Sequence, residues 1–232
     1  MTALVLLPGM DGTGHLFTPL LQALSPAIAP QVVAYPTHQC LGYRELAAHV
    51  EAVLPADGDY VLLGESFSGP VAIALAAGGC ARLRGLILAC SFASTPRPAL
   101  ASLRPLARLL PSPRLALAPL CVALMGWDAT PALRASLAAA LTAVDPKVLR
   151  HRAAAALAVD VTPDLARVAC PVLYLQALGD RVIPARCATQ VQRACPHAEV
   201  ERLPGPHFLL QTRAAQAAAR IEYFVRRSCA VA

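Results

Sequence analysis

The chain has 232 residues, of which 56% are hydrophobic and only 15% are charged. This length suits one or two domains with a substantial core, and the composition excludes an intrinsically disordered chain. The formal net charge is +6. The basic residues are dispersed and lack interleaved aromatic residues, so we expect no nucleic-acid partner.

The apolar character does not take the form of a membrane span. Residues 16–43 lie in the longest segment without Asp, Glu, Lys or Arg, but they contain four prolines and do not suit one spanning helix. The N-terminus has no basic region, and its apolar run ends at Pro8. We therefore expect no signal peptide, no stable membrane insertion and a cytoplasmic location.

The eight cysteines are widely spaced and form no Cys-x-x-Cys pair. A chain with so much apolar sequence does not need disulfides to build a core, and the spacing lacks the clustering of zinc ligands. We expect free thiols in a reducing compartment. No metal and no organic cofactor is implied.

Short apolar runs alternate with longer segments of helical pattern. Runs that are apolar throughout are typical of parallel strands buried on both faces. The alternation predicts an α/β fold, with a doubly wound and mostly parallel sheet. The expected strands are residues 3–7, 31–35, 60–63, 83–89, 171–176 and 198–203, and the helices between them are residues 16–24, 43–54, 67–77, 186–194 and 213–226.

One interval breaks this alternation, because about 80 residues separate the fourth and fifth expected strands. The interval is rich in Leu, Ala and Pro, with leucines at helical spacing, and its prolines divide it into three or four short helices. We expect a helical cap at residues 94–165, inserted after the fourth strand. The core then consists of residues 1–93 and 166–232.

The segment GESFSG, residues 64–69, follows an apolar strand and precedes a helix. This arrangement is typical of a nucleophile elbow, a strained turn that presents a serine, here Ser66, above the edge of a sheet. The turn requires small residues two positions to either side. Gly64 and Ser68 meet that need, although the usual pattern has glycine at the second position. The following helix directs its N-terminal amides to the same point, so we expect the Phe67 N–H to bind an oxyanion.

A second oxyanion donor is expected from LPGMDGTG, residues 7–14, which follows the first strand. We assign this role to the Met10 N–H, and we expect Asp11 to hold the loop by hydrogen bonds to its own backbone. A phosphate cradle is the alternative, but the loop lacks the Lys-Ser/Thr ending of a P-loop and the GxGxxG spacing. His15 either lines the pocket or begins a helix.

With these motifs the sequence resembles the α/β-hydrolase-fold serine hydrolases. LPGMDGTG, GESFSG, the turn LGD at 178–180 and PGPH at 204–207 follow the order of that family, and the resemblance extends over the whole chain. The first two motifs are similar to those of small bacterial esterases and of the esterase/acyltransferase portion of plant phytyl-ester synthases. The family's fold usually has two strands before the LPG strand. Here the chain starts on that strand, which implies a reduced sheet of about six strands.

The resemblance implies a catalytic triad in the chain order serine, acid, histidine. Asp180 follows the strand after the cap and His207 follows the last strand, so these residues complete the expected triad with Ser66. Asp164 precedes its strand, and His197 lies at the wrong end of its strand. His207 would accept the Ser66 proton, and Asp180 would orient the imidazole.

We therefore expect a serine esterase that cleaves small-molecule carboxylic esters with an apolar acyl group through an acyl-enzyme. In the cap, Met125 and Trp127 either line the acyl pocket or belong to the core. The alternative is a thioesterase, or an esterase for acyl chains on an acidic acyl carrier protein. Residues 95–165 carry eight basic residues, Arg152 among them, and four acidic residues, a net charge of +4. This charge would suit an acidic carrier protein, and it is equally explained as ordinary solvated surface of the cap. A non-catalytic hydrolase-fold receptor is a third interpretation.

Overall fold

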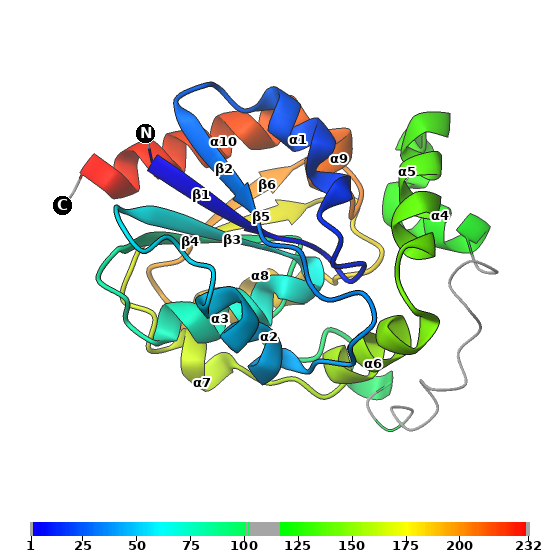
Figure 1. Ribbon diagram of the computed structural model, residues 1–232, viewed down its shortest axis with the longest axis horizontal. Helices are drawn as coiled ribbons and strands as arrows, with labels where there is room; N and C mark the ends of the chain where they lie inside the picture. Colours follow the sequence, from blue (N-terminus) through cyan, green and yellow to red (C-terminus); the bar gives the residue numbers. More distant parts are fainter. Residues whose placement is uncertain (1, 101, 103–116, 231–232) are drawn as a thin grey trace.

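The computed structural model describes residues 2–100, 102 and 117–230, and their centre is one six-stranded sheet (Figure 1). The sheet order is β2-β1-β3-β4-β5-β6, and all five pairings are parallel. The predicted α/β-hydrolase architecture is confirmed, and the sheet is wholly rather than mostly parallel. Its strands are β1 (Thr2–Leu7), β2 (Ile28–Val32), β3 (Tyr60–Glu65), β4 (Leu83–Ala89), β5 (Val172–Ala177) and β6 (Glu199–Leu203).

Helices cover both faces of the sheet, so the inner strands are almost entirely buried. Every residue of β3 and β5 is buried, whereas β6 lies at an edge, carries charged residues and is partly exposed. One face packs against α1 (Thr18–Ala23), α9 (Leu209–Thr212) and α10 (Ala214–Ala230). The opposite face packs against α2 (Tyr43–Glu51), α3 (Gly69–Ala77), α7 (Thr162–Leu165) and α8 (Arg186–Ala194).

The predicted second strand is wrong in position. It was expected at residues 31–35, and it lies at Ile28–Val32. Proline has no backbone N–H to donate to a neighbouring strand. Pro30 is tolerated because β2 is an edge strand with a neighbour on one side only. The apolar residues Val33 and Tyr35 are buried beyond the end of the strand, and Tyr35 N–H donates to the Gly12 carbonyl at 2.7 Å. Their apolar character reflects core burial near the loop after β1.

The segment between β4 and β5 contains α4 (Leu117–Met125), η4 (Gly126–Asp128), α5 (Pro131–Thr142), α6 (Pro146–Ala156) and α7. Thr130 and Asp145 cap α5 and α6 by accepting backbone N–H groups, and proline follows each cap. The two ends of the segment meet at an antiparallel bridge between Ser94 and Asp160. Part of the leucine pattern that predicted helices in this interval, Leu103, Leu106 and Leu110, lies outside the described residues.

The helices α4, α5 and α6 share a small core with residues of the sheet domain. Leu16 and Phe208 pack with Leu137, Leu141 and other residues of these three helices. Figure 1 shows α4 and α5 beside the carboxyl-terminal edge of the sheet. None of the described helices is both long and apolar enough to cross a membrane.

Candidate active site

Ser66 lies where β3 ends and η2 (Ser66–Ser68) leads directly into α3. Its φ is +49°, and among the described residues only Cys90 shares a positive φ without being glycine. A left-handed backbone is costly for a residue with a side chain, and such strain concentrates at functional turns. The tight turn sets the Ser66 hydroxyl above the edge of the sheet.

Two glycines make this turn sterically feasible. A Cβ atom on Gly64 would lie 2.8 Å from the Ser68 carbonyl oxygen, and a Cβ on Gly69 would overlap the Ser91 side chain. Ser91 Oγ donates to the Ser66 carbonyl at 2.5 Å and so holds the turn from below. The second close approach of the elbow therefore falls at Gly69, one position later than the usual pattern.

Ser68 occupies the position where that pattern has glycine, and its side chain is fully buried. Its hydroxyl donates to the Pro8 carbonyl and accepts a hydrogen bond from Tyr35 Oη at 2.6 Å. Burial raises the pKa of Tyr35, so the phenol remains a neutral donor. Sequence reasoning treated Ser68 only as a small residue, whereas its hydroxyl joins the elbow to the loop after β1.

The structure brings the three residues of the predicted triad together. His207 Nε2 lies 3.0 Å from Ser66 Oγ, and His207 Nδ1 lies 2.8 Å from Asp180 Oδ2. The His207 and Asp180 side chains are only 5% and 4% exposed. All three residues follow parallel strands, whose carboxyl ends share one edge of the sheet.

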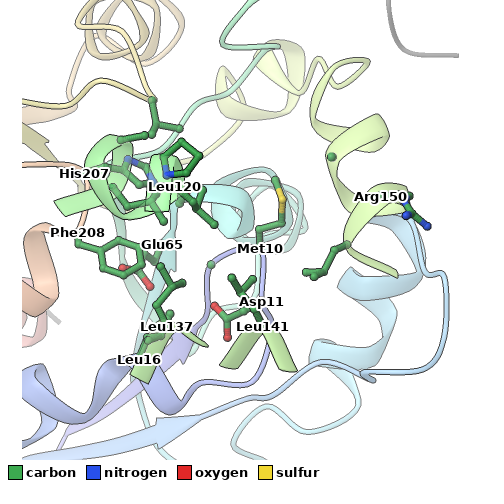
Figure 2. Close-up of a pocket in the computed structure, with 18 residues that line it drawn as sticks. Met10, Asp11, Leu16, Glu65, Leu120, Leu137, Leu141, Arg150, His207 and Phe208 are labelled. Atoms are coloured by element: carbon green, nitrogen blue, oxygen red, sulfur yellow. Dashed lines mark hydrogen bonds between the residues drawn. The ribbon is translucent and has the colours of Figure 1, made fainter. Parts of the chain in front are cut away.

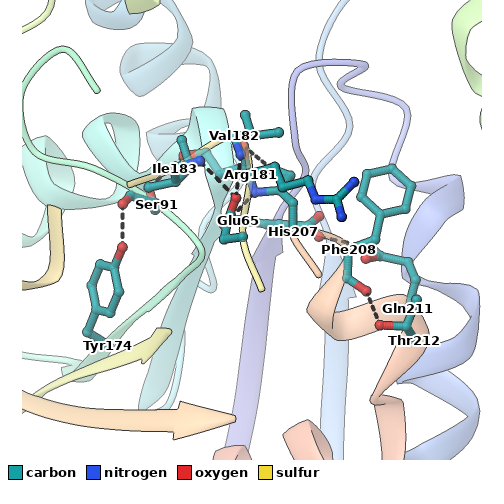
Figure 3. Close-up of polar contacts among 12 residues, drawn as sticks. Glu65, Ser91, Tyr174, Arg181, Val182, Ile183, His207, Phe208, Gln211 and Thr212 are labelled. Atoms are coloured by element: carbon teal, nitrogen blue, oxygen red, sulfur yellow. Dashed lines mark hydrogen bonds and ion pairs between the residues drawn. The ribbon is translucent and has the colours of Figure 1, made fainter. Parts of the chain in front are cut away.

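The loop after β5 fixes Asp180 in this position. Asp180 Oδ1 accepts the N–H groups of Val182 and Ile183, both at 2.8 Å, which leaves Oδ2 for His207 (Figure 3). The competing residues have other partners. Asp164 pairs with Arg167, and His197 contacts the Cys170 carbonyl and the Cys195 thiol.

A turn in the loop after β1 sets the direction of the Met10 N–H, the predicted oxyanion donor. The Gly9 carbonyl accepts the Gly12 N–H at 3.0 Å, so the trans peptide between Gly9 and Met10 points the Met10 N–H the opposite way. Asp11 Oδ2 accepts the Thr13 N–H at 2.8 Å and the Thr13 hydroxyl at 2.6 Å. The expected local hydrogen bonding of Asp11 is thereby confirmed.

The other predicted donor, the Phe67 N–H, directly follows Ser66 at the start of η2. The Phe67 ring is buried and stacks on Tyr43, with 4.8 Å between ring centroids. This ring contact fixes the position of Phe67. Its backbone N–H belongs to the peptide that directly follows Ser66.

A cavity of about 490 Å³ opens over Ser66 and His207 (Figure 2). Its wall is mostly aliphatic, and cap helices supply much of it. A volume of this size suits a small ligand with an apolar portion. The lining residues are Gly9, Met10, Asp11, Leu16, Glu65, Ser66, Val182, His207 and Phe208 of the expected core, with Pro119, Leu120, Ala123, Leu124, Leu137, Leu141, Leu149, Arg150 and Ala153 of the expected cap.

Three residues with two interpretations are now placed. Met125 is fully buried in the cap core, whereas Trp127 is 99% exposed. Neither residue lines the cavity, so a role in the acyl pocket is wrong for both, and a core role is wrong for Trp127. His15 is exposed and begins η1 (His15–Phe17), which agrees with the helix-start interpretation.

A carboxyl group missed by the sequence analysis lies beside the nucleophile. Glu65 is buried, its Oε1 accepts Gln211 Nε2 at 2.9 Å, and the Gly9 amide also donates to the carboxylate (Figure 3). Burial, opposed by the hydrogen bond from Gln211 and assisted by the nearby Asp11 charge, raises the pKa of Glu65 to about 7. The sequence feature that could have identified Glu65 is its position between Gly64 and Ser66, directly before the expected nucleophile.

One group in the described part of the chain has the composition of a metal site. Ligand atoms of Cys90, Asp180 and His207 lie within 4.8 Å of one another. Burial raises the pKa of Cys90, and the Asp180 charge raises it further, whereas metals bind the thiolate. Asp180 and His207 already bond to each other. The donor set fits a hydrogen-bonded pair beside a buried thiol better than a metal centre.

The charge of the cap is less accessible than its sequence suggests. Arg104, Arg108 and Arg114 lie outside the described residues. Arg152 is only 1% exposed, so it is unavailable to an acidic partner. Both interpretations of the positive charge in residues 95–165, solvated surface and docking of an acidic partner, require exposed side chains. Counting Arg152 toward that charge was therefore wrong.

A family model described as the alpha/beta hydrolase family matches residues 4–220. No curated protein sequence matches the chain significantly. Among solved structures, an enol-lactonase from Burkholderia xenovorans is similar, with 18% identity and a TM-score of 0.85, over 97% of this chain and 91% of that one. An esterase from Rhodococcus sp. has 23% identity and a TM-score of 0.81, over 97% and 90% of the two chains. These likenesses concern the fold.

The elbow packing predicts that Gly69→Ala destabilises the protein by about 2–3 kcal/mol, because the new methyl group overlaps the Ser91 side chain. Thermal or urea unfolding measures the effect. Adding Ser91→Gly removes the overlapping atoms, so the double variant should lose less stability than the sum of the single changes. An unchanged melting temperature for Gly69→Ala would contradict this packing.

The buried carboxyl predicts a pH-dependent stability. The pKa of Glu65 is higher in the folded protein, about 7 against 4.5, so its contribution favours folding at low pH and is lost as pH rises through 7. Relative to Glu65→Gln, the wild type should lose up to about 3 kcal/mol of unfolding free energy between pH 4.5 and 8. Urea unfolding at both pH values tests this.

The exposed Glu51 on α2 supplies the control, because Glu51→Gln also removes one carboxyl group. Its pH dependence should follow that of the wild type. Equal slopes for wild type and Glu65→Gln would show that Glu65 does not titrate in this range in the folded protein.

Proposed function

Because the chain belongs to the alpha/beta hydrolase family, we propose that it is a serine hydrolase that cleaves carboxylic esters with an apolar acyl group. The nucleophile is Ser66, the general base is His207, and Asp180 orients that base. The observation that carries the proposal is the unbroken chain of hydrogen bonds from Asp180 through His207 to Ser66 at an aliphatic cavity.

The geometry supports the following reaction. Ser66 Oγ attacks the ester carbonyl while His207 Nε2 accepts its proton, and the carbonyl oxygen becomes an oxyanion. The Met10 and Phe67 N–H groups donate to that oxyanion. The C–O bond to the alcohol then breaks, and His207 protonates the leaving alkoxide. Ser66 is left as an acyl ester.

Hydrolysis of the acyl-enzyme repeats these steps with water. His207 accepts a proton from water, whose oxygen attacks the acyl carbon, and the acid departs as Ser66 recovers its proton. Asp180 assists both halves because it accepts the His207 Nδ1–H and thereby fixes the tautomer with Nε2 free. Its buried negative charge also stabilises the imidazolium that forms.

The cavity supports an apolar acyl group as the preferred substrate portion. Leucine side chains of α4 and α5 face the space above Ser66, and burial of each added methylene is worth about 0.8 kcal/mol. An esterase and an enol-lactonase are among the structural neighbours, and both names denote cleavage of a carboxylic ester bond. Ester hydrolysis is therefore the reaction to test first.

The triad predicts a large loss of turnover without loss of fold. Ser66→Ala and His207→Ala should each lower kcat by several orders of magnitude, and the double variant should be no worse, because the triad acts as one unit. Hydrolysis of p-nitrophenyl butyrate and the melting temperature are the measurements. A fluorophosphonate probe should label the wild type and fail to label Ser66→Ala.

Two controls separate the alternatives. Asp164→Asn alters the competing acid and should retain activity, since Asp164 pairs with Arg167 away from the site. A matched thioester panel distinguishes a thioesterase. Retention of most activity by Ser66→Ala would sink the assignment of the nucleophile, and absence of probe labelling in the wild type would favour a receptor.

The cavity predicts selection by acyl length. Relative to acetate, each added carbon should raise kcat/KM by roughly fourfold until the cavity is full. Ala123→Trp on α4 fills part of the cavity and should move the optimum to shorter esters. Val122→Trp is the control, because Val122 is the exposed neighbour on the same helix. A flat profile from acetate to palmitate would contradict an acyl pocket.

A further inference from the structure

The loop after β1 contains a four-residue turn whose conformation decides where the Met10 N–H points. The turn runs from Gly9 to Gly12 and is closed by the Gly12 N–H donating to the Gly9 carbonyl. Asp11 has no positive φ, so the turn is not of type II, which requires one at its third residue. The one hydrogen bond within such a turn uses the carbonyl of its first residue, so the carbonyls of the two central residues, Met10 and Asp11, are free to accept from groups outside the turn.

Both carbonyls find the same partner in the cap. Arg152, on α6, donates from Nη1 to the Met10 carbonyl at 2.9 Å and to the Asp11 carbonyl at 2.8 Å. Its Nη2 donates to the Pro36 carbonyl at 3.0 Å. One guanidinium thus clamps the turn and ties it to the segment after β2.

The site around this guanidinium is shaped for it. Any Cβ on Gly12, whose φ is +73°, would overlap the guanidinium. Arg152 Cζ lies 5.5 Å from the centre of the Tyr35 ring, in cation–π range. Burial lowers the pKa of Arg152, and the nearby Tyr35 and Asp11 groups counter that effect. An arginine this deeply buried is sustained by specific partners.

We propose that Arg152 is a positioning residue for catalysis, and that α6 completes the oxyanion hole by clamping the turn from Gly9 to Gly12. The proposal rests on the proposed function, in which the Met10 N–H binds the oxyanion. Arg152 holds the Met10 and Asp11 carbonyls and thereby keeps the turn closed. In the closed turn the Gly9 carbonyl accepts the Gly12 N–H, and this sets the direction of the Met10 N–H, which belongs to the same peptide as that carbonyl.

The test compares Arg152→Met and Arg152→Lys with the wild type. We measure kcat, KM, the melting temperature and the inhibition constant of an alkyl boronic acid, which forms a tetrahedral adduct on the serine. A misdirected donor weakens the transition state more than the ground state, so kcat should fall about 100-fold while KM changes little. The boronic acid should bind more weakly by a similar factor, and Arg152→Lys should recover part of the loss.

Lys147→Met is the matched control, because Lys147 is an exposed cation on the same helix. It should keep the kcat and the boronic acid affinity of the wild type. If Arg152→Met does not fold, Arg152→Gln is the second variant. Its shorter neutral side chain cannot hold all three carbonyls, so it should give the same pattern, a fall in kcat with little change in KM.

The outcomes separate this inference from the proposed function. Loss of activity in Ser66→Ala together with unchanged kcat and boronic acid affinity in both Arg152 variants would overturn the role of Arg152 alone. A fall in kcat with unchanged boronic acid affinity would also overturn it. Full activity in Ser66→Ala would instead overturn the proposed function.

Discussion

The backbone turn at Ser66 is the constraint to which the rest of the site is adjusted. A strand that passes directly into a helix leaves no room for a loop, so Ser66 adopts a left-handed conformation with φ +49°. The turn has no room for a side chain at Gly64 or Gly69. The Ser91 hydroxyl stabilises the turn by donating a hydrogen bond to the Ser66 carbonyl. The carboxyl ends of β5 and β6 lie at the same edge, and from there Asp180 and His207 reach the serine.

The loop after β1 is held from three sides by buried polar groups. Ser68 reaches it from the elbow, Glu65 from the end of β3, and Arg152 from the cap. Buried polar groups are costly unless they are hydrogen-bonded, so each contact that is present disfavours other loop conformations. The conformation of this loop thus depends on contacts from the end of β3, the elbow and α6 together.

Sequence patterns predicted the parallel α/β sheet, although the second strand was misplaced. Apolar runs identify strands that are buried on both faces, and a parallel sheet places their carboxyl ends together. The choice of Asp180 and His207 as partners of Ser66 came from the chain order that the family resemblance implies. Arg152 was missed because a single arginine in a polar helix has the pattern of a surface residue. The prediction for Trp127 was wrong because a large apolar side chain in this segment was expected to be buried, whereas it is exposed.

The two ionisable side chains that the sequence analysis missed, Glu65 and Arg152, lie against the same loop. Glu65 and Arg152 approach the same loop from different elements, and Asp11 lies in that loop and interacts with both. The Asp11 charge raises the pKa of Glu65, whereas it favours the charged form of Arg152. The loop carbonyls solvate the arginine, and the Gly9 amide solvates the glutamate. The negative ends of the peptide dipoles thus face the arginine, and the positive end of one faces the glutamate. The loop backbone replaces the hydrogen bonds that water would make to these side chains in the unfolded chain.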